Sequence, residues 1–146
     1  MHCMLCNIIF GYIVDVVITE WALQSYLDLR ARSVFSDQEY WNVLRPDVQL
    51  LKSGLPSPHP KLQQSNFWGP ATRKNGAVIH DGYKMKWHNL GHGKVQLRLC
   101  VAMLGDAYLC QAYVKDSAAV DQREMAKLGV RINLIKNGQY QYRGRL

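Results

Sequence analysis

The N-terminal half of the chain has the hydrophobic pattern of one strand followed by a helix. Residues 12–19 are rich in β-branched side chains and follow Gly11, which predicts a strand. Apolar side chains then recur about every 3.6 residues from Glu20 to Arg32, and Thr19 is a suitable N-cap. We therefore expect a strand that runs directly into an amphipathic helix.

A second helix and a stiff connector follow. Ser36 and Glu39 have the spacing of a capping box, and the apolar face that they introduce continues to Gly54. Pro46 lacks the amide donor that a helix interior needs, so it should kink or restart this helix. Residues 55–60 contain three prolines and should be extended.

The middle of the chain has the pattern of an antiparallel meander. The turn Lys74-Asn75-Gly76 predicts a hairpin between residues 67–73 and 77–80. Further strands are predicted at residues 83–89, 95–104 and 107–115, with turns at 81–82, 91–93 and 105–106. A helical pattern begins after Ser117, and Asn137-Gly138 ends it.

This order predicts one α+β domain at residues 13–138, with its helices on one face of an antiparallel sheet of four or more strands. Residues 1–12 are expected to be an N-terminal extension. Residues 139–146 are expected to be a basic tail that folding does not need but that contributes to binding.

Composition and charge favour a globular protein with an anionic partner. The chain has 146 residues, of which 48% are hydrophobic and 20% charged, enough for one domain with a real core. Its net charge of +7 favours RNA, DNA or an acidic protein as the partner.

The cysteines and the apolar N-terminal segment indicate a reducing cytoplasm and no membrane span. Cys3 and Cys6 form a C-x-x-C without a matching second pair, so neither zinc nor another metal is expected. Residues 7–19 are shorter than the ~20 residues that cross a bilayer, Asp15 interrupts them, and they lack the pattern of a signal peptide.

The most informative segment is the predicted strand at residues 83–89. Because alternate residues of a strand share a face, one face carries Lys84, Lys86 and His88, and the other carries Tyr83, Met85 and Trp87. The next predicted strand can bring Arg98 alongside the cations. The alternative is an ordinary solvated strand face. Four large aromatic residues are candidates for base stacking or for the core: Trp41, Phe67, Trp68 and Trp87.

Such a row of cations has the groups that RNA cleavage requires. One group must take the proton of the 2′-OH, another must neutralise the phosphate, and a third must protonate the leaving oxygen. Neighbouring cations lower the pKa of a lysine such as Lys84 or Lys86. Arg98 can clamp a phosphate with two hydrogen bonds, and His88 is the best ordinary acid or base available.

Three segments resemble the RelE/ParE superfamily of bacterial toxins. They are Val16-Val-Ile-Thr-Glu-Trp-Ala-Leu-Gln-Ser-Tyr-Leu27, Asp81-Gly-Tyr-Lys-Met-Lys86, and a closing region with Arg98, Tyr113-Val-Lys115, Arg123-Glu124 and Arg131. The resemblance implies a RelE-like β-α-α-β-β-β-α fold. It also implies a metal-independent endoribonuclease without a cofactor, which cleaves mRNA on the ribosome and inhibits translation. A cognate antitoxin would neutralise it in a toxin–antitoxin hetero-oligomer.

Under this resemblance the candidate catalytic residues are Lys84, Lys86, His88 and Arg98. The candidate RNA-binding residues are Lys94, Lys115, Arg123, Lys127, Arg143 and Arg145.

The chain departs from the family pattern in two places. The segment 54–81 is longer than the usual link, and the last predicted helix offers Gln122 and Arg123 where the family places a tyrosine. Tyr140 or Tyr142 could replace that tyrosine if the tail folds back over Lys84 and Arg98. Two alternatives remain: a ParE-like inhibitor of DNA gyrase with the same fold, and a non-catalytic RNA-binding protein.

Overall fold

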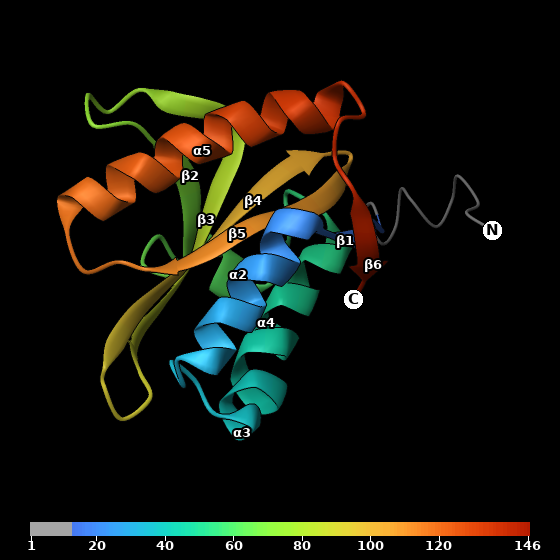
Figure 1. Ribbon diagram of the computed structural model, residues 1–146. Helices are drawn as coiled ribbons and strands as arrows, with labels where there is room; N and C mark the ends of the chain where they lie inside the picture. The colour runs from blue at the N-terminus through green and yellow to red at the C-terminus, as the bar shows by residue number, and fades with distance from the viewer. Residues whose placement is uncertain (1–12) are drawn as a thin grey trace.

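The protein is an α+β domain built on a six-stranded mixed sheet (Figure 1). The computed structural model describes residues 13–146, so the predicted extension at residues 1–12, with Cys3 and Cys6, lies outside the described residues. The strands follow the order β2-β3-β4-β5-β1-β6 across the sheet.

The regular elements lie close to the predicted ones. The strands are β1 (Val16–Thr19), β2 (Trp68–Thr72), β3 (Val78–Leu90), β4 (Val95–Leu104), β5 (Asp106–Val114) and β6 (Tyr142–Arg145). The α-helices are α2 (Glu20–Ala31), α3 (Asp37–Glu39), α4 (Arg45–Gln49) and α5 (Ala118–Lys136). A π-helical turn (Tyr40–Leu44) joins α3 to α4, and 3₁₀ turns occupy Leu50–Ser53 and Pro60–Gln63.

Side-chain caps fix the starts of the helices as predicted. The Thr19 hydroxyl accepts a hydrogen bond from the amide of Ala22, and Ser36 forms the full capping box with Glu39. Ser117 caps α5 in the same way. Pro46 stands in the first turn of α4, directly after the π-helical turn, so the helix restarts where the proline removes an amide donor.

The predicted hairpin is confirmed, but one predicted turn is not. β2 and β3 pair antiparallel around a turn in which Gly76 has a φ of 84°. The turn predicted at residues 81–82 is wrong, because β3 continues through it. Asp81 has a φ of 66° there, and the pairing with β2 shifts between Pro70 and Thr72, so the segment is a bulge that bends the strand.

The sheet is mixed rather than antiparallel. β1 pairs parallel with β5, with Val16 opposite Ala107, and antiparallel with β6. The prediction of an antiparallel sheet followed from strands joined by short turns. Most of the chain separates β1 from β5 in the sequence, so no short turn fixes their relative direction.

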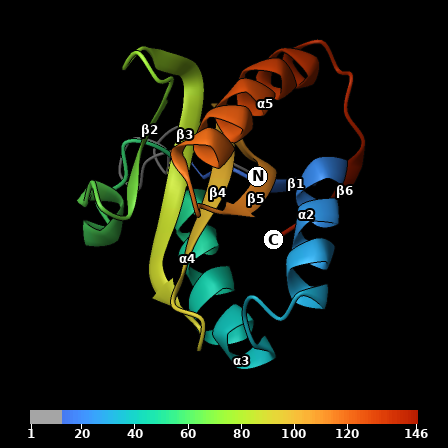
Figure 2. The ribbon, with the colours of Figure 1, turned by 60° about the vertical axis from the view of Figure 1, so that its left-hand side comes forward.

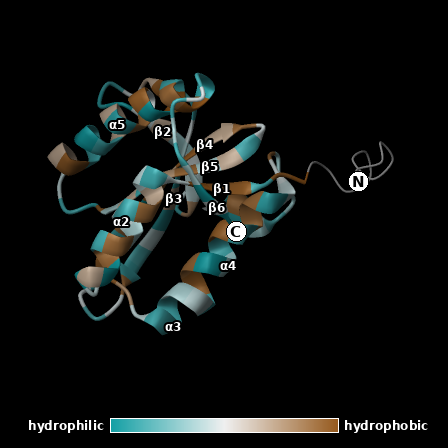
Figure 3. Ribbon diagram, turned by 45° about the vertical axis from the view of Figure 1, so that its right-hand side comes forward, coloured by the Kyte–Doolittle hydropathy of each residue, from teal (hydrophilic) through white to brown (hydrophobic). Residues whose placement is uncertain are grey.

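The helices cover both faces of the sheet, which corrects the prediction of helices on a single face. Figure 2 shows α2 and α4 on one side of the strands and α5 on the other. Each side has its own hydrophobic cluster, one around Met85 and Leu99 and one around Cys100 and Leu128. Both α2 and α5 carry hydrophobic and hydrophilic patches along their length, as expected for helices that cover a sheet (Figure 3).

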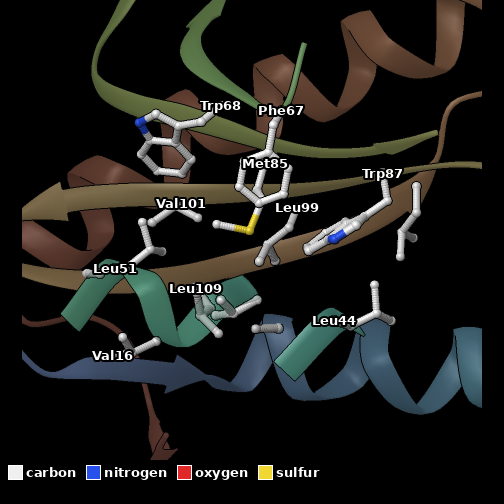
Figure 4. Close-up of a cluster of buried hydrophobic side chains, with 14 of the residues drawn as sticks. Val16, Leu44, Leu51, Phe67, Trp68, Met85, Trp87, Leu99, Val101 and Leu109 are labelled. Atoms are coloured by element: carbon white, nitrogen blue, oxygen red, sulfur yellow. The ribbon is translucent and has the colours of Figure 1, made fainter. Parts of the chain in front are cut away.

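The cluster beneath α2 and α4 is the larger core. Met85 is fully buried there, and three of the four aromatic residues considered for base stacking, Phe67, Trp68 and Trp87, surround it (Figure 4). Trp41 is the exception, with 60% of its surface exposed.

The C-terminal segment that was expected to be a tail is part of the sheet. Residues 142–145 form the edge strand β6, and the amide of Leu146 donates to the carbonyl of Val16 at 3.0 Å. Tyr140 packs edge-on against Tyr108, with ring centroids 5.6 Å apart. The final residues therefore contribute to the packing of the domain.

Candidate functional site

The predicted cationic row lies on the α5 face of the sheet. Lys84 and Lys86 alternate along β3 with Met85, whose side chain is fully buried on the opposite face, so the predicted register is confirmed. Lys86 is directly opposite Arg98 in the antiparallel pair of β3 and β4. The two adjacent strands thus bring these cations together without any contribution from loops.

One end of the row lies beneath α5 and contains a buried ion pair. The ammonium of Lys84 lies 3.3 Å from the carboxylate of Asp121, and only 8% of Lys84 is exposed. The hydroxyl of Tyr113, on β5, donates a hydrogen bond to the same carboxylate. Lys84 is therefore held in place by a helix and two strands.

Sequence reasoning did not identify Asp121 or Tyr113 as site residues. Asp121 stands in the first turn of α5, which places it over β3 because the helix crosses that strand. Tyr113 lies opposite Arg98 on the neighbouring strand. The available signal was an acidic residue in the first turn of the predicted helix, but the partner of that residue depends on which face of the sheet α5 covers.

Burial and the contacts around Asp121 together shift the pKa values of Asp121 and Tyr113. Burial opposes the charge on Asp121, but the hydrogen bond from Tyr113 and the charge of Lys84 together outweigh it, so the pKa of Asp121 is lowered. Burial, with the nearby Cys100 and the hydrogen bond to Asp121, raises the pKa of Tyr113. Tyr113 therefore stays a hydroxyl donor and does not act as a base.

Lys86 has a pKa that is shifted towards the neutral form and a side chain that reaches solvent. Burial lowers its pKa from the usual 10.5, and the charges of Lys84, Arg98 and Lys115 lower it further. Its ammonium donates to the carbonyl of Ser65 at 3.1 Å, and its side chain is only partly buried. It combines a lowered pKa with access to solvent, as a group that exchanges protons requires.

Arg98 is the most deeply buried of the candidate catalytic residues. Only 7% of the residue is exposed, and one guanidinium nitrogen donates to the carbonyls of Leu97 at 3.1 Å and Trp87 at 3.4 Å. Burial is the main cause of its lowered pKa. These contacts tie the guanidinium to the backbones of β3 and β4 and fix the position of its charge.

His88 is exposed at the far end of the row, and the protein uses both of its ring nitrogens. Nε2 donates to the carbonyl of Asn66 at 2.6 Å, and Nδ1 lies 3.0 Å from the side-chain oxygen of Gln96. The predicted role of His88 as an acid or base would therefore require one of these contacts to open.

The predicted RNA-binding residues divide into two groups of three. The first group is Lys94, Lys115 and Arg123, and the second is Lys127, Arg143 and Arg145. Lys115 lies close enough to Lys86 to lower its pKa, Lys94 is exposed at the β3–β4 turn, and Arg123 is exposed on α5. The other group lies away from the row. Lys127 pairs with Glu124 at 2.7 Å, and Arg143 and Arg145 are on β6.

The position of β6 rules out one suggested arrangement. β6 is the outermost strand at the opposite edge of the sheet from β2, and Arg145 pairs there with Asp15 at 3.3 Å. Tyr140 packs on Tyr108 of β5. The C-terminal segment therefore does not fold over Lys84 and Arg98, and its tyrosines do not replace the missing helical tyrosine.

The described residues contain no cluster that resembles a metal site. Across residues 13–146 no three His, Cys, Asp or Glu side chains come together in a way that could hold a metal ion. Cys100 and Cys110 are both free and buried, and burial raises the pKa of the Cys110 thiol to about 12. In the same part of the chain, no helix has the length and apolar character needed to cross a membrane.

Comparison with known proteins gives no relative. No protein family, curated protein or solved structure matches the chain. The geometry of the row is therefore the basis on which a function can be proposed.

Proposed function

We propose that the protein is a RelE-like toxin, an endoribonuclease that cleaves mRNA on the ribosome. The observation that carries this proposal is the pairing of Lys86 with Arg98 on adjacent strands. One of these cations has a pKa lowered by burial and by its neighbours, and the other is held in place by two carbonyl groups.

The row supplies a role for each step of strand cleavage by the 2′-hydroxyl. The neutral amine of Lys86 takes the 2′-OH proton while the 2′ oxygen forms a bond to the adjacent phosphorus. The guanidinium of Arg98 stabilises the additional negative charge on the phosphate. The bond to the 5′ oxygen then breaks, and the Lys115 ammonium protonates that oxygen.

Lys84 is assigned a supporting role in this scheme. Its ion pair with Asp121 keeps a fixed positive charge beside Lys86, which contributes to the lowered pKa of Lys86. Since the base is the neutral form of Lys86, cleavage should rise with pH until that lowered pKa is reached, below the usual value of 10.5.

The toxin assignment extends from this chemistry through the resemblance of three segments to the RelE/ParE superfamily. It implies a cytoplasmic protein that acts on translating ribosomes and is held inactive by a protein antitoxin. The net charge of +7 favours ribosomal RNA and an acidic antitoxin alike as partners.

A non-catalytic RNA-binding protein is the second candidate, and three contacts favour it. Lys84 is tied to Asp121, and both ring nitrogens of His88 are hydrogen-bonded to the protein. A site with these groups occupied would bind a phosphate backbone without cleaving it.

Controlled expression in bacteria separates these candidates. Under the proposal, wild type arrests growth and translation, Lys86→Met does not, and Lys52→Gln, which removes one charge outside the row, remains toxic. Growth arrest with a DNA-damage response and intact translation would instead indicate a gyrase inhibitor with the same fold. Expression without any growth defect would favour the RNA-binding protein.

A further inference from the structure

A second group of cations lies in the turn between β2 and β3, beside α5 (Figure 2). Arg73 and Lys74 are both exposed, and neither has an acidic partner within the described residues. The turn that carries them is ordered by the hydrogen bond from the amide of Arg73 to the carbonyl of Ala77, at 2.8 Å. These charges are therefore presented by a tight hairpin.

A hollow of about 280 Å³ separates this turn from the N-terminal half of α5. A water molecule takes about 30 Å³ of liquid volume, so the hollow has room for a phosphate group and accompanying water. Its lining consists of Thr72, Arg73, Lys74, Lys115, Ala118, Asp121, Gln122 and Met125. Lys115 and Asp121 also belong to the site around Lys86, so the hollow continues that site.

The balance of charge in the hollow is positive. Three cations and one carboxylate, that of Asp121, line it. This carboxylate is already paired with Lys84 and accepts a hydrogen bond from Tyr113. An anion entering the hollow would thus meet three cations that have no acidic partner in the described part of the chain.

The helix surface is shaped to leave room for Arg73. A Cβ atom at Gly129, inside α5, would lie 2.8 Å from a guanidinium nitrogen of Arg73. Glycine inside a helix costs roughly 0.5–1 kcal/mol relative to alanine. The absence of a side chain at position 129 allows the guanidinium to lie directly against the helix, at the side of the hollow.

We propose that this hollow binds a backbone phosphate of the RNA strand next to the phosphate that is cleaved. The inference rests on the proposed ribonuclease function and adds a substrate subsite to it. Lys115 is shared between the hollow and the row, so one strand can cross both, with successive phosphates at Arg98 and at Arg73. The hairpin that supplies Arg73 and Lys74 lies in the segment that is longer than the usual link of the resembled family.

The test measures binding of a single-stranded 2′-O-methyl oligonucleotide, which lacks the nucleophile and cannot be cleaved. Fluorescence anisotropy at a series of salt concentrations gives the slope of log Kd against log salt. For single strands each phosphate contact contributes about 0.7 to this slope. Because the hollow holds one phosphate, Arg73→Gln/Lys74→Gln should lower it by about 0.7.

A charge-matched control is Arg32→Gln/Lys52→Gln. Arg32 is exposed at the end of α2, and Lys52 lies in a 3₁₀ turn, where its carbonyl accepts a hydrogen bond from the amide of Val14, just before β1. This control should keep the wild-type slope. Lys86→Met should lower the slope by about 0.7 through the row itself.

The outcomes separate the subsite from the function. An unchanged slope for Arg73→Gln/Lys74→Gln, with a reduced slope for Lys86→Met, would overturn the subsite and leave the ribonuclease proposal standing. Equal losses in the hollow variant and its control would also overturn the subsite, because only general charge would then matter. A wild-type protein that does not bind the oligonucleotide would overturn both.

Discussion

The two faces of β3 and β4 carry different kinds of side chain although alternate residues of the same two strands form both. On the face beneath α2 and α4, Met85 and Leu99 belong to a continuous apolar core. On the face beneath α5, Lys86 and Arg98 lie among an ion pair, a buried tyrosine and several further cations. The first face is filled by apolar packing, and the second combines the smaller hydrophobic cluster around Cys100 and Leu128 with these charged groups.

The difference shows which face determines the structure. A one-residue shift in strand pairing would move Met85 into the charged face and Lys86 into the core. The apolar core therefore fixes the register, and the cations occupy their positions as a consequence. The arrangement is energetically unfavourable for the charged face, because burial and like charges destabilise the charged form of Lys86.

The largest effect on stability is expected when the apolar face is broken. Met85→Ala removes a fully buried side chain and should lower the free energy of unfolding by about 3 kcal/mol, because it leaves a cavity in the core. Urea denaturation measures this change. Lys86→Met, one residue away, should lie within about 0.5 kcal/mol of wild type, since its side chain reaches solvent. If Lys86→Met unfolded the protein and Met85→Ala did not, the register described for β3 would be wrong.

The next effect comes from breaking the ion pair on the charged face. Asp121→Asn leaves the buried ammonium of Lys84 without its partner and should cost about 3 kcal/mol at neutral pH. Tyr113→Phe, which removes only the hydrogen bond to the carboxylate, should cost less, about 1–2 kcal/mol.

The pH dependence of the wild type sharpens this prediction. The pKa of Asp121 is lowered by folding, so its contribution is fully present above the usual 3.8 and is lost as the pH falls through the lowered value. Stability measured against pH should therefore fall steeply in acid for wild type and less steeply for Asp121→Asn. Parallel curves for the two proteins would show that the carboxylate is not stabilised by the fold.

A smaller loss is expected from removing the C-terminal strand. Truncation after Asn137 removes the β6 pairing with β1 and the packing of Tyr140 on Tyr108, which should together cost about 2 kcal/mol. The sequence had suggested that this segment is dispensable for folding, and the strand reverses that expectation. Thermal melting of the truncated chain decides between the two, and an unchanged Tm would support a dispensable tail.

The smallest expected effect is an increase in stability. Gly129→Ala removes a flexible residue from the interior of α5 and displaces only the mobile end of the Arg73 side chain. Helix propensity then predicts a stabilisation of about 0.5 kcal/mol, visible as a slightly higher Tm. A lower Tm would mean that the contact of Arg73 with the helix contributes to stability.

Local features of the fold could be predicted from the sequence because they depend on neighbouring residues. The caps at Thr19, Ser36 and Ser117, the hairpin around Gly76 and the alternation along β3 all follow from short-range rules. The pairing of Lys86 with Arg98 also follows, since a tight turn joins the two strands and limits their register.

Features that depend on long-range packing could not be predicted in this way. The parallel pairing of β1 with β5, the position of α5 on the second face and the addition of β6 join segments far apart in the chain. The Lys84–Asp121 pair depends on the placement of α5, so the residue that anchors the site was missed together with the face that carries it.

The most direct test of the account is cleavage of a defined mRNA in a purified translation system, followed by primer extension. Wild type should produce discrete cuts, and Lys86→Met should reduce their rate by about 10²-fold or more while its unfolding curve stays close to wild type. The matched control Lys52→Gln should cleave as wild type does. Cleavage by Lys86→Met within tenfold of wild type would contradict the account, as would a folded wild-type protein that leaves the mRNA intact.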